Sequence, residues 1–175
     1  INIKGVYLMP SCANPTGIVM PEERRRKIAA VLCKHNMLLI EDDAYGFTAR
    51  ENAAPMTVLL PRQSVYLHSL SKLTCPGLRV AYMLVPAHFR QLIRRAARSI
   101  SMAIPPLSAE IASELIESGT AERIMREKCR MSEDRNRIFR GIFPAHTGST
   151  RGFFQWMPLP VGCGGANFEA QAQHR

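Results

Sequence analysis

The feature that most constrains the fold is a strand, a helix and a second strand in succession near the start of the chain. Gly5–Met9 is a short apolar run, and Met37–Ile40 is another. Between them, Pro21 stands at a favourable first helical position, and Glu22 and Glu23 complement the dipole of the helix that follows. Such a unit within about 35 residues is a βαβ unit, whose strands are parallel because of the crossover connection. We therefore predict an α/β protein.

The remainder of the chain continues the alternation of strands and helices. The further elements that we expect are strands at 64–68 and 80–85, helices at 87–104 and 107–117, and a long charged helix from Thr120 to about Arg140. Such a polar helix often bridges two domains. Phe153, Phe154 and Trp156 then suggest one more strand. We expect one domain at 1–118, and a bridging helix with the start of a second domain at 119–175.

Composition excludes several classes of protein. Hydrophobic residues make up 46% of the chain and no apolar run approaches the roughly 20 residues that span a bilayer, so we expect a soluble cytoplasmic protein without membrane association. The five cysteines are scattered without a C-x-x-C pair, which indicates reduced thiols and no metal site. The net charge of +9 includes stretches such as Arg24–Lys27 and Arg94–Arg98, which we interpret as solvated helix faces. No helix-turn-helix or zinc-finger pattern accompanies them.

Polar side chains follow three of the predicted strands. Asn14 comes after the first strand, Asp42 ends the second, and Ser69 and Lys72 follow the third. Open α/β sheets bind ligands beyond the carboxyl ends of their strands. A lysine amine can form a Schiff base, while hydroxyls and the Arg79 guanidinium suit phosphate oxygens. These residues predict a site for a phosphorylated cofactor that carries a carbonyl group, and a solvated surface turn is the alternative.

Four motifs occur in a fixed order along the chain. They are Asn14-Pro15-Thr16-Gly17, Asp42-x-Ala44-Tyr45, Ser69-x-Ser71-Lys72-(x6)-Arg79 and Gly152-x-Phe154-x-Trp156-x-x-Leu159-Pro160. With them the chain resembles, from residue 5 to about 160, class I/II aminotransferases, the fold-type-I enzymes that use pyridoxal 5′-phosphate. The segments 104–110 and 119–122 further resemble the aminotransferase-like domain of MocR-type regulators, in which a GntR-type DNA-binding winged helix comes first.

This resemblance implies a fold and a role for each site residue. Residues 1–118 would be the C-terminal part of the pyridoxal-phosphate-binding large domain, a mainly parallel sheet flanked by helices, and 119–175 would begin a small α+β domain. Lys72 would form the Schiff base and serve as general acid and base for the 1,3-proton shift. Asp42 would pair with the pyridine nitrogen. The residues implied for the phenolic oxygen are Asn14 and Tyr45, and those for the phosphate are Ser69, Ser71 and Arg79.

Rival interpretations stay open at several of these positions. Asp42 lies just after the four apolar residues 37–40 and Glu41, and so also resembles a magnesium-binding Walker B carboxylate, although the chain contains no G-x-x-x-x-G-K-[ST] loop. Tyr45 is compatible with core packing, Asn14 with a turn and Arg79 with an ion pair in the fold. The residues that we interpret as structural or solvated are Glu41, Asp43, His68 and Cys75. Arg151 is not a safe substitute for the arginine that the family uses to bind the substrate carboxylate.

The start of the chain indicates that sequence precedes it, and three hypotheses for its function remain open. It opens at Ile1 inside an apolar run and without methionine, so we expect sequence upstream, including the family's glycine-rich phosphate loop. One hypothesis is an aminotransferase that moves an amino group between an amino acid and a 2-oxo acid. The second is a pyridoxal-phosphate-binding effector domain of a MocR/GntR-type regulator, which contacts DNA only through a missing N-terminal domain. The third is a truncated product without activity. The resemblance implies a homodimer for the full-length protein.

Overall fold

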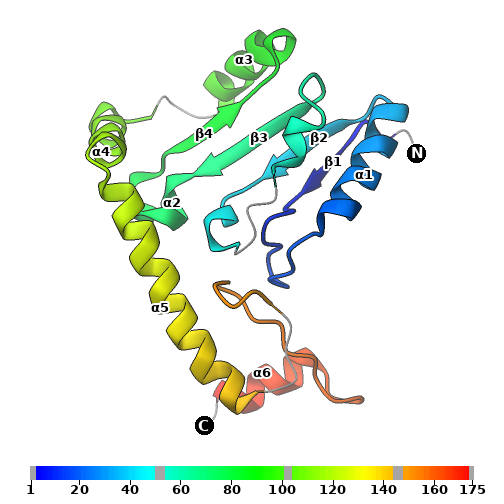
Figure 1. Cartoon of the computed structure of the whole chain (residues 1–175), viewed down its shortest axis with the longest axis vertical. Coiled ribbons are helices and arrows are strands. Elements are labelled where there is room, and N and C mark those ends of the chain that lie inside the picture. The colour runs from blue at the N-terminus through cyan, green and yellow to red at the C-terminus, as the bar shows by residue number, and fades with distance from the viewer. Residues whose placement is uncertain (1–2, 50–53, 101–103, 144–147, 174–175) are drawn as a thin grey trace.

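The fold is built on a four-stranded sheet, with helices around it and one long helix leading away from it (Figure 1). The structure is a computed structural model that describes residues 3–49, 54–100, 104–143 and 148–173. The strands, in their order across the sheet, are β1 (Gly5–Leu8), β2 (Leu38–Asp42), β3 (Ser64–Ser69) and β4 (Ala81–Leu84). The first three are parallel and β4 is antiparallel to β3. The predicted α/β fold with a mainly parallel sheet is confirmed.

Six helices and four short 3-10 turns are found in the described part of the chain. The helices are α1 (Glu22–Lys34), α2 (Leu70–Leu73), α3 (Arg90–Ile100), α4 (Pro106–Glu117), α5 (Thr120–Ile142) and α6 (Gly165–Gln173). The 3-10 turns are η1 (Gly46–Thr48), η2 (Met56–Val58), η3 (Pro76–Leu78) and η4 (Ala87–Phe89). The helix expected at 87–104 therefore begins as a 3-10 turn, and its positions 101–103 lie outside the described residues.

Two apolar clusters hold the helices to the sheet. The first lies between α1, β2 and η2 and consists of Ala29, Leu32, Leu39, Met56 and Leu60. The second joins α2, α4 and α5 and consists of Leu70, Leu73, Val80, Ala112 and Ala121. Burial of a leucine side chain stabilises a fold by about 1.5–3 kcal/mol, so α2 is fixed through its two leucines even though it is a single turn.

Arg25 departs from the solvated helix face that we expected for Arg24–Lys27. Its side chain is only 1% exposed. Its guanidinium donates from Nε to Met20 O at 2.9 Å, from Nη2 to Pro10 O at 3.0 Å and from Nη1 to Ala54 O at 3.2 Å. A buried guanidinium needs acceptors for its donors, and three loop carbonyls supply them here. α1 is thereby tied to the loop that follows β1.

Glu41 and Asp42 point to opposite faces of β2, as the alternation of a strand requires. The Glu41 side chain is fully buried. It accepts from Met56 N at 2.9 Å, Thr57 N at 2.7 Å and Thr57 Oγ1 at 2.6 Å. These three bonds fasten η2 to the sheet, so the structural role expected for Glu41 agrees with its contacts. Asp42 is left on the other face.

The strand expected around Phe153–Trp156 is absent from the described residues, where Trp156 occupies only an isolated bridge position. The backbone carbonyls of residues just before Trp156 accept hydrogen bonds from side chains and not from a neighbouring strand. Asn136 Nδ2 donates to Thr150 O at 2.9 Å, and Ser132 Oγ donates to Gly152 O at 3.1 Å. Side chains of α5 take the place that a neighbouring strand would fill, so no ladder forms.

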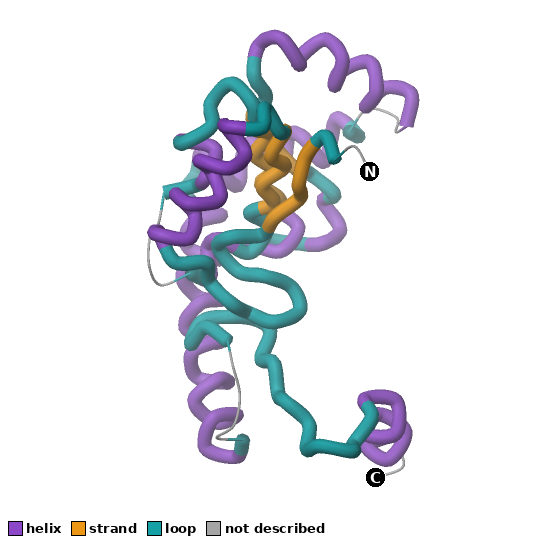
Figure 2. The backbone as a smooth tube through the Cα atoms, turned by 90° about the vertical axis from the view of Figure 1, so that its right-hand side faces the viewer, coloured by secondary structure: helices purple, strands orange, loops and turns teal. Residues whose placement is uncertain are grey.

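The long helix α5 leads away from the sheet, and α6 lies at the far end of the molecule from the strands (Figures 1 and 2). The helix expected from Thr120 to about Arg140 is thus present, with its end at Ile142. Among the residues that the structure describes, none of the helices has the length and apolar character needed to cross a membrane.

Candidate functional site

The carboxyl ends of β1, β2 and β3 lie along one edge of the sheet, on the side of α2, η1 and the segment 148–156 (Figure 1). β3 leads directly into α2, the turn that contains Lys72. Ser69 caps this turn, because its Oγ accepts from Ser71 N at 3.2 Å. Leu70 and Leu73 point into the core while Lys72 is exposed. The local sequence therefore directs one amine outward from a turn that is held on its apolar side.

Lys72 and Tyr45 are brought together although they are distant in sequence. The Lys72 Nζ lies 5.8 Å from the centroid of the Tyr45 ring. Tyr45 is buried and packs edge-to-face on Phe154, with centroids 4.8 Å apart and an interplanar angle of 74°. A cation near a ring face is attracted by the ring quadrupole. The contact gives the exposed amine a defined place beside η1.

Asp42 is the last residue of β2, and both of its carboxylate oxygens are engaged. Oδ1 accepts from Ala44 N at 2.9 Å, and Oδ2 accepts from the hydroxyl of Tyr7 on β1. Burial, followed by this hydrogen bond and the charge of Asp42, raises the pKa of Tyr7 to about 12. Tyr7 therefore stays protonated and remains a donor. Each carboxylate oxygen has further lone pairs, so Asp42 can accept another hydrogen bond.

Tyr7 was not among the residues predicted from the sequence. The signal for it is the register of the sheet, in which Tyr7 pairs with Ile40 and so lies on the same face as Asp42 two residues on. The alignment of β1 with β2 depends on the fold, so the spacing along the chain could not supply it.

The loop with Asn14 faces the segment 148–156. It is closed by Ala13 N to Ile18 O at 2.9 Å and Gly17 N to Ala13 O at 2.6 Å. Gly17 has a φ of +67°, and a Cβ there would stand 2.8 Å from Phe154 O. Glycine is therefore required at this position by both conformation and space. Phe154 thus contacts the Asn14 loop and Tyr45, and it joins two of the predicted site regions.

Three predicted site residues keep their polar groups available. The Lys72 amine, the Asn14 amide and the Arg79 guanidinium are exposed, and none of them forms a hydrogen bond or an ion pair with a residue that the structure describes. Arg79 also has a left-handed backbone, with φ 55° and ψ 33°. Non-glycine residues adopt this conformation rarely and at some cost in free energy. Ser71 is buried beside Leu70 in the same turn.

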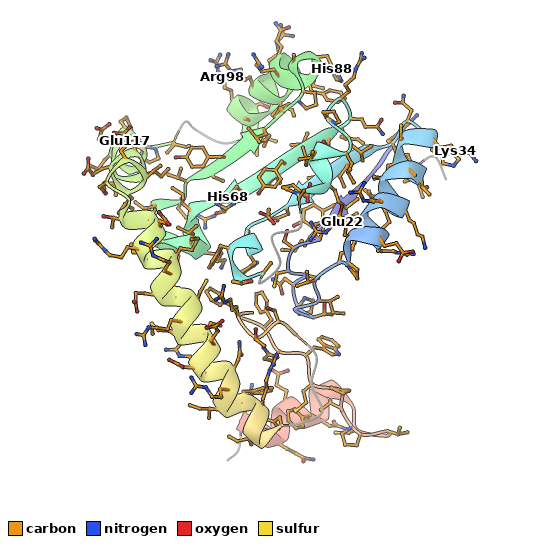
Figure 3. The ribbon with its side chains drawn as sticks, in the orientation of Figure 1. Glu22, Lys34, His68, His88, Arg98 and Glu117 are labelled. Atoms are coloured by element: carbon orange, nitrogen blue, oxygen red, sulfur yellow. The ribbon has the colours of Figure 1, made fainter. Side chains whose placement is uncertain are left out.

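The residues expected to be structural are engaged elsewhere. Tyr66 donates to Asp43 Oδ2 at 2.5 Å, and burial with this bond raises the pKa of Tyr66 well above its usual value. His68, labelled on the sheet in Figure 3, stacks on Tyr66 with centroids 6.5 Å apart. Arg151 Nε bonds Glu133 Oε1 at 2.5 Å, and this partner raises the pKa of the guanidinium. Arg151 is thus committed to an ion pair, and its exclusion as a carboxylate-binding residue is consistent with that contact.

The chain matches the family described as aminotransferase class I and II over residues 2–164. It belongs to that family. The class I and II aminotransferase fold accounts for the mixed sheet and for the helices on its faces, and the predicted fold-type-I architecture is confirmed. No group of three or more histidine, cysteine or acidic side chains suited to a metal is found in the described ranges.

Its relatives include both regulators and enzymes. The chain is 34% identical over 173 residues to the uncharacterized HTH-type transcriptional regulator YdeF of Bacillus subtilis, and the match covers 98% of this chain and 37% of the regulator. It is 30% identical to a 2-aminoadipate transaminase of Thermus thermophilus, with 90% of this chain and 43% of the transaminase covered. This chain therefore spans about two fifths of the length of these relatives.

A solved structure shares the fold closely. It is the α-aminoadipate aminotransferase LysN of Thermus thermophilus, determined with N-(5′-phosphopyridoxyl)-L-leucine. The TM-score is 0.87 at 26% identity, and the match covers 97% of this chain and 47% of LysN.

Proposed function

We propose that this chain is the pyridoxal-phosphate-binding part of an aminotransferase, with Lys72 as the residue that holds the cofactor covalently. The observation that carries the proposal is the exposed Lys72 amine near the Tyr45 ring, which forms no hydrogen bond or ion pair with a described residue. It lies on a turn that is capped by Ser69 and anchored by its leucines. The phosphopyridoxyl adduct named for the LysN structure supports the same cofactor class. We also propose a homodimer and a cytoplasmic location.

The donor set at this edge of the sheet fits pyridoxal phosphate. When bound, the cofactor supplies an aldehyde that condenses with amines and a ring that accepts electrons. Asp42, fixed by Tyr7 and Ala44, would accept a hydrogen bond from the protonated ring nitrogen. Tyr45 and Asn14 would bond the phenolic oxygen. The residues for the phosphate would be Ser69, Ser71 and Arg79.

Once the amino group of the substrate has replaced the Lys72 amine at the cofactor, the released Lys72 amine would also move the proton of the amino-group transfer. Its amine is exposed and free of any bond to a described side chain, so it can take a proton at Nζ and return it elsewhere on the substrate. Tyr45 is buried and Phe154 is half-buried, and together they would form an apolar wall that excludes water from one side of the amine. The substrates would be an amino acid and a 2-oxo acid.

The test is covalent labelling of the intact protein. After incubation with pyridoxal phosphate and reduction with borohydride, peptide mapping should find the label on Lys72, and Lys72→Ala should abolish it. Lys27 is an exposed lysine on α1 that serves as a matched control. A label on another lysine, with normal uptake of the cofactor, overturns the assignment.

A second function is favoured by one specific observation. The match to YdeF covers 98% of the chain at 34% identity, and YdeF is a regulator of the HTH type. In this alternative the domain binds pyridoxal phosphate as an effector with little turnover, and an N-terminal domain contacts DNA. We propose for either function that residues 1–118 complete a large domain and that 119–175 begin a small one.

A further inference from the structure

Helix α5 has a row of side-chain donors along one face. Lys128, Ser132, Asn136 and Arg140 recur at intervals of four residues, which places them on the same side of the helix. Ser132, Asn136 and Arg140 donate to backbone carbonyls of the segment 148–152. Lys128 differs from the other three because it reaches the turn of Lys72.

The Lys128 ammonium bonds two carbonyls at the end of α2. Its Nζ donates to Lys72 O at 3.0 Å and to Thr74 O at 2.6 Å. The last carbonyls of a helix have no partner within the helix, and a cation at that end also interacts favourably with the helix dipole. Burial lowers the pKa of Lys128. No described carboxylate pairs with it, so this lysine is committed to the two carbonyls and not to a surface ion pair.

We propose that Lys128 is a positioning residue for Lys72, and this inference rests on the function proposed above. Ser69 fixes the turn from its N-terminal side, and Lys128 holds the carbonyl of Lys72 itself from the other side. The backbone of the reactive lysine is thereby held at both ends. Only its side-chain torsions then remain to bring the amine over Tyr45, and such restriction raises the effective concentration of a reacting group.

The structural consequence of losing Lys128 is local. Two carbonyls of the Lys72 turn would lose their charged donor, while the apolar cluster around Leu70 and Leu73 would stay intact. The turn would loosen without unfolding of the sheet. Lys128 lies on α5, 56 residues after Lys72. The position of α5 therefore affects where the backbone of Lys72, and with it the reactive amine, is held.

The experiment compares Lys128→Met, Lys128→Arg and Arg135→Met in the intact protein. Arg135 lies on the same helix and is exposed, so Arg135→Met matches the loss of a cation without loss of the two bonds. The first readout is the rate at which pyridoxal phosphate becomes borohydride-trappable on Lys72. We expect Lys128→Met to slow it about 10- to 100-fold, since a small misplacement of a reacting group has effects of this size. Lys128→Arg should restore much of the rate, and Arg135→Met should leave it unchanged.

The second readout needs no cofactor. Amide hydrogen exchange around Leu73–Cys75 should be faster in Lys128→Met than in the wild type, with β2 and β3 unchanged. Wild-type trapping in Lys128→Met, or wild-type exchange in this turn, overturns the inference. If the wild-type protein itself is not labelled on Lys72, the proposed function fails, whereas the exchange measurement still decides whether Lys128 holds the turn.

Discussion

At the scale of single residues, the burial of Tyr7 and its hydrogen bond to Asp42 make the free energy of unfolding depend on pH in the alkaline range. The pKa of Tyr7 is raised from 10.0 to about 12. Between these two values the folded protein binds the tyrosine proton more tightly than the unfolded chain. The contribution of Tyr7 to stability is thus complete below pH 10 and is lost as the pH rises toward 12.

We therefore expect the free energy of unfolding of Tyr7→Phe to fall less steeply than that of the wild type as the pH rises from 10 to 12. At neutral pH the variant should be less stable by at most about 1 kcal/mol, because Tyr7 is half exposed and water can replace its hydroxyl. Urea unfolding across the alkaline range measures both effects. Tyr82→Phe, on exposed β4, is the matched control. An equal alkaline loss in Tyr7→Phe and in the wild type would contradict the assignment.

The residues whose roles the sequence predicted well are those whose roles follow from their immediate neighbours in sequence. Strand alternation separates Glu41 from Asp42, and their hydrogen bonds agree with that separation. Tyr7 and Lys128 were missed because their partners are 35 and 56 residues away. Such contacts depend on strand register and helix placement, and a single sequence gives no spacing rule for either of them.

At the scale of secondary-structure elements, Arg25 determines how α1 meets the loop after β1. The three carbonyls that it bonds come from Met20, Pro10 and Ala54. A substitution by Met fills a similar space but leaves these acceptors without a donor. We expect Arg25→Met to lower the free energy of unfolding by about 2–3 kcal/mol, the range for buried groups that lose a charged partner.

The matched control is Arg24→Met, because Arg24 is the exposed neighbour on the same helix. Urea unfolding of both variants gives the comparison. Loss of the Arg25 bonds should also increase hydrogen exchange at Ala13 and Gly17, whose amides close the Asn14 loop. Equal stability of the two variants would show that the buried guanidinium contributes nothing to this junction.

The elements themselves were largely predictable, and the exceptions have physical causes. The βαβ unit followed from apolar periodicity and from the acidic start of α1. Arg25 was wrongly expected to be solvated, because a run of basic residues does not reveal that one of them faces loop carbonyls. The strand expected near Trp156 was wrong because α5 side chains bond the carbonyls of the preceding residues. Aromatic residues there pack on Tyr45 and form no sheet.

At the scale of the whole molecule, the order of the four motifs along the chain was sufficient to predict the family. Three of the motifs lie at the carboxyl ends of β1, β2 and β3, and the fourth comes after α5. The same residues are proposed to bind the cofactor in an enzyme and in an effector domain, so they do not separate the two functions. Relatives of both kinds match the chain over most of its length. Turnover of the intact protein is the property that differs.

We expect the intact protein to catalyse amino-group transfer with repeated turnover. With pyridoxal phosphate, an amino acid and a 2-oxo acid, it should form the new 2-oxo acid catalytically, because the Lys72 amine has no hydrogen bond or ion pair with a described residue and is able to move a proton. Lys72→Ala should reduce the rate at least about 100-fold, as loss of a positioned general base does. Product formation is measured by a coupled assay. Arg135→Met should keep wild-type turnover.

Cofactor attachment to Lys72 without turnover would contradict the enzymatic proposal and favour the regulator. In that case the amino acid would act by changing the affinity of the intact protein for DNA, and the change would be reciprocal. DNA would then alter the affinity for the amino acid by the same factor, whereas an enzyme that does not bind DNA would show no such coupling. Titration of the cofactor-loaded protein with amino acid, in the presence and absence of its upstream DNA, distinguishes the two functions. The deciding quantity is the ratio of the two dissociation constants for the amino acid.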